Sequence, residues 1–266
     1  MGVVGYGVVG QATAHLFGGA AVYDPAKGFD DPAVLADCPV IFLCVPTPTV
    51  HGRNDLSLLH HALAALAPVL REGQVLAVRS TVLPGTMRAL GARYPRLRFA
   101  ANPEFLRSHR AFQDALRPYR TVVGADDPGT AEAVVRAYRA RLPADTPFVV
   151  TDSVSAELIK YAANAFLATK IAYAHEVWAA AQRLGADYGA VSTALGLDPR
   201  IGAGEELVVD PDDPGFSDEC LPKDLAAFVT FLAELGLPAR LPRAAGAVND
   251  AVRGRQDPLA GVGEEG

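Results

Sequence analysis

The chain has 266 residues, a length that suits one large domain or two smaller ones and is sufficient to bury a core. Half of the residues are hydrophobic, which excludes an intrinsically disordered protein. The formal net charge of -6 argues against nucleic acid as the main partner, and no apolar run approaches the ~20 residues that span a bilayer.

A strand, a glycine turn, a helix and a second strand open the chain. Residues 1–4 are predicted to form the first strand, and Gly5-Tyr6-Gly7-Val8-Val9-Gly10 follows before the helix-forming run QATAHLF. The second strand, residues 20–23, ends at Asp24. Dinucleotide binding needs this order, because the glycines let the backbone approach a pyrophosphate at the helix N-terminus while the carboxylate binds the ribose hydroxyls. Since Asp24 would repel a 2′-phosphate, the pattern predicts NAD rather than NADP.

Strands and helices continue to alternate as far as residue 150. The run PVIFLCV, residues 39–45, is continuously apolar, which is typical of a strand buried on both faces. The further predicted strands are 74–80, 97–101, 121–124 and 147–150, and the predicted helices include 55–70 and 129–141. This alternation predicts an α/β fold with a Rossmann-type, doubly wound parallel sheet.

Three polar segments follow predicted strands directly. They are Pro46-Thr47-Pro48-Thr49, Ser80-Thr81 and Asn102-Pro103-Glu104. The carboxyl ends of parallel strands meet at one edge of the sheet, which is where such folds bind ligands. The sequence therefore predicts a site at this edge.

One long helix is predicted over residues 154–184, bounded by Thr151-Asp152-Ser153 and by Gly185. It carries a broad apolar stripe with helical spacing: Ile159, Phe166, Leu167, Ile171, Ala174, Val177, Trp178, Ala181 and Leu184. Lys160 and Asn164 are four residues apart and so share a face. By themselves they fit a solvated face and a functional one equally well.

After Gly185 the chain is predicted to be helical, with apolar-periodic pieces at 190–195 and 225–235. A loop over 202–219 separates them and leads into the sequence CLPKD. We therefore predict an NAD-binding Rossmann domain over 1–151, the long helix with a small all-helical dimerisation and substrate domain over 152–250, and a disordered tail over 251–266.

Seven motifs, in order, give the chain a resemblance to the UDP-glucose/GDP-mannose dehydrogenase family over nearly its whole length. They are GYGVVG (5–10), VPTP (45–48), STVLPGT (80–86), NPEFLR (102–107), ELIKYAANAFLATKI (157–171), DPRIG (198–202) and CLPKD (220–224). The resemblance implies a nucleotide-sugar 6-dehydrogenase, which oxidises a primary alcohol to a carboxylate with two NAD per turnover.

The resemblance also implies roles for individual residues. Cys220 matches the nucleophile, whose thiolate traps an aldehyde as a thiohemiacetal that is then oxidised to a thioester and hydrolysed. Lys160 matches the lysine that stabilises the developing oxyanion, and Asn164 would orient the sugar hydroxyl or the water. Glu104 and Asp224 match the carboxylates that activate water.

Cofactor and substrate contacts follow from the same motifs. Thr81 matches a polar group beside the sugar or the nicotinamide and is counted with the implied catalytic residues. The implied cofactor-binding residues are Gly5, Tyr6, Gly7, Val8, Val9, Gly10, Asp24, Val45, Pro46, Thr47, Ser80 and Thr81. The implied substrate-binding residues are Glu104, Phe105, Leu106, Arg107, Lys160, Asn164, Arg200, Phe216 and Lys223.

The chain departs from the family pattern at three places, one of which is Ser108-His109 after NPEFLR, where the family usually has Glu-Gly. Ser217-Asp218-Glu219 stands where the family commonly has two glycines and a small residue, and two carboxylates beside a thiol disfavour the thiolate. The resemblance also ends near Val248-Asn249-Asp250, which implies a short form without the family's C-terminal nucleotide-binding domain. The identity of the base and the sugar therefore stays open, and a nucleoside is an alternative substrate.

A homodimer is expected, because the long helix displays more apolar surface than a small helical cap can cover. In the family this region forms the dimer contact, and Arg200 matches an arginine that reaches the substrate across the subunits. Three irregularly spaced cysteines predict neither disulfides nor zinc, and the six histidines show no ligand spacing, so no metal is expected. The start MGVVGYG has no basic segment of a signal peptide, which favours a soluble cytoplasmic protein with neither a membrane nor a nucleic-acid partner.

Two other functions remain open from the sequence. A two-electron NAD-dependent alcohol dehydrogenase of the β-hydroxyacid type shares the Rossmann domain, the long helix and a Lys-x-x-x-Asn pair, but it has no use for Cys220. A non-catalytic NAD-binding homologue would bind the cofactor without turnover.

Overall fold

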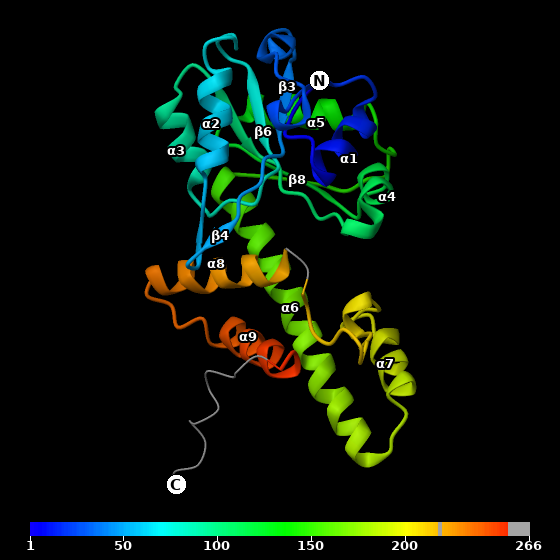
Figure 1. Ribbon diagram of the computed structural model, residues 1–266. Coiled ribbons are helices and arrows are strands. Elements are labelled where there is room, and N and C mark those ends of the chain that lie inside the picture. The colour runs from blue at the N-terminus through cyan, green and yellow to red at the C-terminus, as the bar shows by residue number, and fades with distance from the viewer. Residues whose placement is uncertain (218–219, 255–266) are drawn as a thin grey trace. The chain divides into compact units, whose positions relative to one another are not determined.

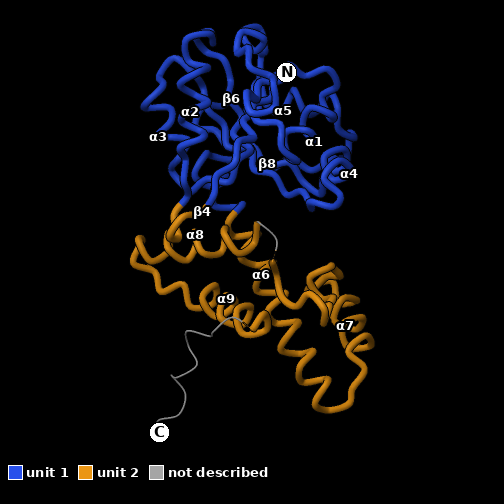
Figure 2. Tube along the Cα trace, in the orientation of Figure 1, with its two compact units in different colours: residues 1–48, 54–160 blue, residues 49–53, 161–266 orange. Residues whose placement is uncertain are grey.

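The computed structural model describes residues 1–217 and 220–254 (Figure 1). The chain forms two compact units (Figure 2). The first comprises residues 1–48 and 54–160, and the second comprises residues 49–53 and those from 161 onward. The long helix α6, Ser153–Leu184, contributes to both units.

The described part of the first unit is built on a seven-stranded sheet with the order β2-β1-β3-β6-β7-β8-β9. The strands are β1 (Gly2–Val4), β2 (Ala21–Tyr23), β3 (Val40–Leu43), β6 (Val75–Val78), β7 (Arg98–Ala101), β8 (Thr121–Gly124) and β9 (Phe148–Thr151). β1 pairs in parallel with both β2 and β3, so the chain changes direction across the sheet at β1. The α/β prediction is confirmed, and the turn after β1 lies at the switch point where such sheets bind ligands.

One strand pair is antiparallel, contrary to the expected all-parallel sheet. β7 and β8 pair through Ala101 and Gly124, while β8 and β9 are parallel to each other. The connection between β7 and β8 contains a 3-10 turn (Ser108–Arg110) and the short helix α4 (Ala111–Leu116), which packs on helix α1 (Val8–Phe17). Parallel neighbours need a crossover that returns along the sheet. Because α4 makes no such return, β8 enters from the opposite end.

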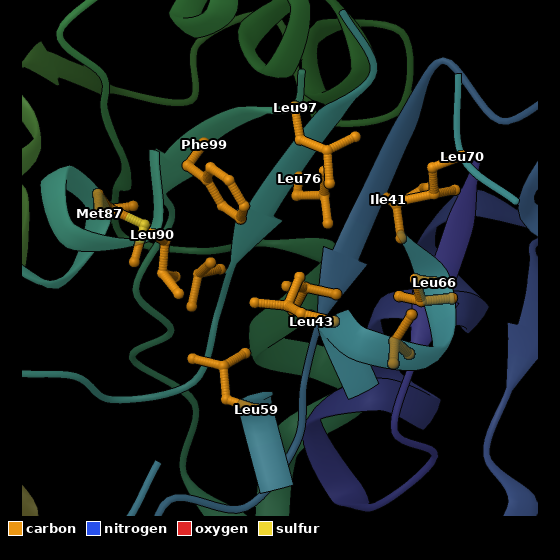
Figure 3. Packing of buried hydrophobic residues seen from close by; sticks show 14 of the residues in the cluster. Ile41, Leu43, Leu59, Leu66, Leu70, Leu76, Met87, Leu90, Leu97 and Phe99 are labelled. Atoms are coloured by element: carbon orange, nitrogen blue, oxygen red, sulfur yellow. The ribbon is translucent and has the colours of Figure 1, made fainter. Parts of the chain in front are cut away.

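Side chains from both faces of the sheet are buried, which explains the continuous apolar runs. On one face Ile41, Leu43 and Leu76 pack with residues of α2 (Ser57–Leu66) and α3 (Thr86–Arg93), including Leu59, Leu66, Met87 and Leu90 (Figure 3). On the other face the Phe42 ring stacks on the Phe17 ring of α1, with 4.7 Å between the ring centroids. The Tyr138 ring of α5 (Pro128–Arg139) packs edge-on against Phe42 at a centroid distance of 5.6 Å. Ile41 and Phe42 therefore point to opposite faces, as the period of a strand requires.

α6 begins and ends close to the predicted residues. Asp152 Oδ1 accepts the Ser155 N–H at 3.0 Å, and Gly185 has a φ of +65° just after the last turn. Near the start, the Glu157 carboxylate accepts the N–H groups of Gly85 at 2.6 Å and of Met87 at 2.7 Å, which caps α3. Phe166, within the predicted apolar stripe, is 63% exposed.

The second unit contains the rest of α6 with α7 (Tyr188–Leu197), α8 (Leu221–Glu234) and α9 (Arg240–Val252). α8 packs against α9, and the hairpin of β4 (Thr49–Val50) and β5 (Arg53–Asn54), absent from the predicted elements, brings Arg53 to 2.6 Å from Glu234 of α8. Of the predicted tail, 251–252 lie in α9 and 255–266 lie outside the described residues. Among the helices that the structure describes, none is long and apolar enough to cross a membrane.

Candidate active site

Two positions in the turn between β1 and α1 require glycine, Gly5 for its backbone conformation and Gly10 for a close backbone contact. Gly5 has a φ of +83°, a conformation that favours glycine. A Cβ atom on Gly10 would lie 1.9 Å from the Gly5 carbonyl oxygen, so no larger residue fits there without moving the backbone. These two glycines therefore let the first turn of α1 pack directly on the end of β1.

Gly7, in contrast, faces open space. A Cβ atom there would meet no protein atom within 4 Å, and Gly7 precedes α1 without a side chain to cap the helix. The first N–H groups of α1 are thus left to an outside acceptor, and a helix N-terminus favours an anion. The chain's own backbone fits the pyrophosphate of a dinucleotide at this position.

Asp24, at the end of β2, is hydrogen-bonded to the backbone of the glycine turn. Its Oδ2 accepts the N–H of Tyr6 at 2.7 Å, and the Tyr6 ring packs edge-on against Phe29 at 5.3 Å. The carboxylate at the end of β2 is therefore held directly beside the glycine turn, where a ribose would follow a bound pyrophosphate.

The predicted polar segments after β3 and β6 are joined by hydrogen bonds. Thr47 Oγ1 donates to the carbonyl of Thr81 at 2.7 Å, and Ser80 Oγ donates to the carbonyl of Val45 at 2.6 Å. The structure thus brings together Val45, Pro46, Thr47, Ser80 and Thr81, as expected for one edge of a parallel sheet.

A buried ion pair follows the end of β7. Lys160 Nζ lies 2.9 Å from Glu104 Oε1 and donates to the Glu104 carbonyl at 2.7 Å, and the two side chains are 5% and 11% exposed. Burial opposes ionisation of Glu104, but the Lys160 ammonium and the Leu106 N–H at 2.8 Å outweigh it and hold the pKa of this carboxyl below its ordinary value. Glu104 is therefore an ionised carboxylate at neutral pH.

A buried arginine, Arg79, lies close enough to Glu104 to influence its charge, and the sequence did not predict it. Arg79, 7% exposed, donates to Asn102 Oδ1 at 3.1 Å and to the Tyr138 hydroxyl, while Asn102 Nδ2 donates to the carbonyl of Val122 at 2.8 Å. This network fixes the start of the NPEFLR segment, and the Arg79 charge also lowers the pKa of Glu104. A basic residue directly after the apolar strand VLAV is the signal that could have revealed it.

The remaining residues of NPEFLR contact other parts of the first unit. Arg107 forms a close ion pair with Asp114 at 2.7 Å and also donates its backbone N–H to the same carboxylate. The Phe105 ring lies under the guanidinium of Arg120 at 3.9 Å and faces Lys160 Nζ at 5.4 Å. The substrate contacts expected for Phe105, Leu106 and Arg107 stay predictions.

A second polar cluster lies at the start of α8, in the second unit. Asp224 is 1% exposed and accepts from Asn164 Nδ2 at 2.6 Å and from Lys223 Nζ at 2.5 Å. Cys220 is half-buried at the N-cap of the helix, and its carbonyl accepts the Asp224 N–H at 3.0 Å. A helix N-terminus stabilises a thiolate, so Cys220 has the setting of a nucleophile.

Two further predicted residues lie elsewhere in the second unit. Phe216 is buried, whereas Arg200 is exposed and pairs with Asp198 at 2.6 Å. Asp218 and Glu219 lie outside the described residues. Within the parts of the chain that are described, no cluster of three His, Cys, Asp or Glu side chains could hold a metal ion.

Apart from Thr81, which contacts Thr47, the predicted catalytic residues fall into two clusters. One is Glu104 with Lys160, and the other is Cys220 and Asp224 with Asn164. α6 contributes to each of them, since Lys160 and Asn164 are one turn apart on this helix.

Comparison with known proteins matches both parts of the chain to domains of one family. The NAD binding domain of the UDP-glucose/GDP-mannose dehydrogenase family matches residues 29–141, and the central domain of that family matches residues 154–251. A putative UDP-glucose 6-dehydrogenase of Bacillus subtilis is 35% identical over 230 residues, covering 81% of this chain and 51% of its own. The chain therefore spans about half the length of this curated relative.

Solved structures agree with these matches. A UDP-glucose dehydrogenase from Pyrobaculum islandicum superposes with a TM-score of 0.84 at 32% identity, covering 94% of this chain and 67% of the other. A 3-hydroxyisobutyrate dehydrogenase from Mycobacterium tuberculosis superposes with a TM-score of 0.71 at 17% identity, covering 96% of this chain and 94% of the other. The second likeness is one of fold alone.

Proposed function

The chain belongs to the UDP-glucose/GDP-mannose dehydrogenase family, and from this premise we propose that it oxidises the primary alcohol of a nucleotide sugar to the carboxylate with NAD. The observation that carries the proposal is the start of α8, where Cys220 is the N-cap residue and Asp224, one turn later, is a buried carboxylate held by Asn164 and Lys223. A simple two-electron alcohol dehydrogenase has no use for such a thiol.

The proposed reaction divides into two oxidations and a hydrolysis. Bound NAD supplies the hydride acceptor for each oxidation. The Cys220 thiolate adds to the carbon of the first product, an aldehyde, and forms a thiohemiacetal. Loss of a second hydride leaves a thioester, and water then adds to its carbonyl and releases the acid with the Cys220 thiol.

The other site residues stabilise charge and move protons. The Lys160 ammonium, held by Glu104, donates a hydrogen bond to the negatively charged oxygen that develops on the reacting carbon of the sugar. Glu104 and Asp224 are the carboxylates that take the proton of the attacking water. Asn164, fixed by Asp224, orients the hydroxyl or the water.

The product ratio tests the proposal. The purified chain is incubated with NAD and a panel of UDP-sugars, GDP-sugars and nucleosides, and NADH is counted per substrate consumed. Two NADH and an acid are expected for the true substrate. One NADH with an aldehyde or ketone would replace the proposal with a two-electron dehydrogenase, and NAD binding without NADH from any compound would favour a non-catalytic homologue.

The cofactor preference is expected to depend on the charge of Asp24. Asp24→Asn keeps an oxygen that accepts the Tyr6 N–H but removes the negative charge that repels a 2′-phosphate. We expect the preference for NAD over NADP to fall about tenfold, which corresponds to ~1.4 kcal/mol, while the Kd for NAD changes little. Titration of both cofactors by fluorescence measures this. An unchanged preference would show that Asp24 does not select the cofactor.

We also propose that the protein is a homodimer in solution. Exposed apolar side chains on α6 and α7 support this, namely Phe166, Tyr173, Leu184 and Leu197. Light scattering at micromolar concentration is expected to give twice the chain mass of 27.9 kDa. A mass of one chain would contradict the proposal, together with the substrate contact of Arg200 across subunits.

A further inference from the structure

A segment shortly before Cys220, residues 213–216, is held by side chains of the second unit, two of which lie on helices α6 and α9. On α6, His175 Nε2 accepts the Gly215 N–H at 2.8 Å. On α9, Asn249 Oδ1 accepts the Phe216 N–H at 2.7 Å, and Asn249 Nδ2 donates to the Phe216 carbonyl at 3.2 Å. Two side chains thus satisfy three backbone groups of two consecutive residues.

A third side chain holds the beginning of the same segment. Arg253, which follows α9, donates from Nη1 to Asp213 Oδ1 at 2.9 Å and to the Pro214 carbonyl at 2.7 Å. We call His175, Asn249 and Arg253 the clamp. Together they fix the path of four consecutive residues, 213–216, which end four positions before Cys220.

The two Asn249 contacts of the clamp are buried and closely fitted, whereas the Arg253 contact to Asp213 is exposed. His175 and Asn249 are 3% and 4% exposed, so no bulk water replaces their hydrogen bonds. Gly215 has a φ of +77°, and a Cβ atom on it would lie 2.3 Å from Asn249 Oδ1. Only glycine at position 215 lets the Asn249 side chain approach the backbone this closely. A larger residue there would displace Asn249.

We propose that His175 and Asn249 are positioning residues for Cys220, because they hold Gly215 and Phe216 a few residues before the thiol at the N-terminus of α8. This rests on the proposed function, in which Cys220 is the nucleophile. Neither residue touches the reacting atoms in this scheme. Their effect passes through the backbone of Gly215 and Phe216.

The hydrogen bond to Gly215 requires a neutral His175, since a doubly protonated imidazole has no acceptor. Burial lowers the pKa of His175 below its ordinary value of 6.5. Of the charged groups on the surrounding elements, Asp213 and Arg253 pair with each other, and neither they nor Glu176 and Asp250 contribute to this shift. The clamp is therefore complete above about pH 6.5 and is lost as the pH falls through the folded-state pKa.

Two variants of His175 separate the hydrogen bond from the volume of the side chain. His175→Gln places an amide oxygen near the position of Nε2 and does not titrate, so it is expected to keep the clamp at every pH. His175→Leu keeps a buried side chain but removes the acceptor. Asn249→Leu removes the contacts to Phe216 in the same way.

Hydrogen exchange and thiol alkylation on the full chain test the proposal. In His175→Leu we expect the protection of the Gly215 amide to fall about tenfold or more, and the half-buried Cys220 to react several-fold faster with iodoacetamide. Lowering the pH stepwise from 7.5 through the folded-state pKa of His175 should weaken Gly215 protection, corrected for intrinsic exchange, in the wild type but not in His175→Gln. Equal protection and equal alkylation in wild type and His175→Leu would overturn the proposal.

These readouts do not depend on turnover. If the wild type forms no acid from any substrate but the exchange and alkylation results are as expected, the positioning role stands and the proposed function fails. Should His175→Leu not fold, the comparison of wild type and His175→Gln across pH decides. A pH response identical in these two proteins would remove His175 from the clamp.

Discussion

Cys220→Ser is expected to lower the rate of acid formation by about three orders of magnitude or more, as removal of a catalytic nucleophile commonly does. A serine hydroxyl is not ionised at neutral pH, so it does not trap the aldehyde at a useful rate, and no thioester forms. The Kd for NAD is expected to stay unchanged, because the glycine turn and Asp24 belong to the first unit. NADH release and product analysis measure the first effect, and cofactor titration measures the second.

Cys38→Ala is the matched control for this substitution. Cys38 is a buried thiol packed in the apolar cluster of the first unit, away from the proposed chemistry. Its variant should lose some stability but retain two NADH per substrate. If Cys220→Ser also retained two NADH per substrate at the wild-type rate, the thioester route would be wrong.

The sequence predicted those parts of the fold that depend on local patterns. The continuous run in β3 required a strand with both faces covered, and Ile41 and Phe42 lie in two separate apolar clusters. Asp152 and Gly185 likewise bound α6, because capping is a property of a few neighbouring residues.

Features that depend on residues far apart in the chain were not predictable in this way. The contact between His175 and Gly215 joins positions 40 residues apart, and that between Arg79 and Tyr138 joins positions 59 residues apart. The antiparallel entry of β8 depends on where α4 packs, which its six residues do not reveal. The ion pair between Arg107 and Asp114 was likewise not predicted, while the substrate contact of Arg107 stays a prediction.

Lys160→Met is expected to impair both stability and turnover. It leaves the Glu104 carboxylate buried without its cation, a change that typically costs about 3–5 kcal/mol of unfolding free energy. Turnover should fall roughly 100- to 1000-fold, because the oxyanion loses its donor. Chemical denaturation at pH 7 and steady-state kinetics measure the two effects. Lys170→Met is the control on the same helix, because its pair with Glu206 is longer, at 3.7 Å, and more exposed.

The pH dependence and a double variant separate the two effects of Lys160. In the wild type the pKa of Glu104 is below its ordinary 4.5, so the ion pair stabilises the fold above that pH and its contribution is lost as the pH falls through the folded-state pKa. The stability difference between wild type and Lys160→Met should therefore shrink on acidification, as Glu104 becomes protonated. Adding Glu104→Gln to Lys160→Met removes the unpaired charge and should restore much of the stability at pH 7. Activity should not return with it, because both the donor to the oxyanion and the Glu104 carboxylate are missing, and a double variant that recovered both would remove Lys160 and Glu104 from the proposed chemistry.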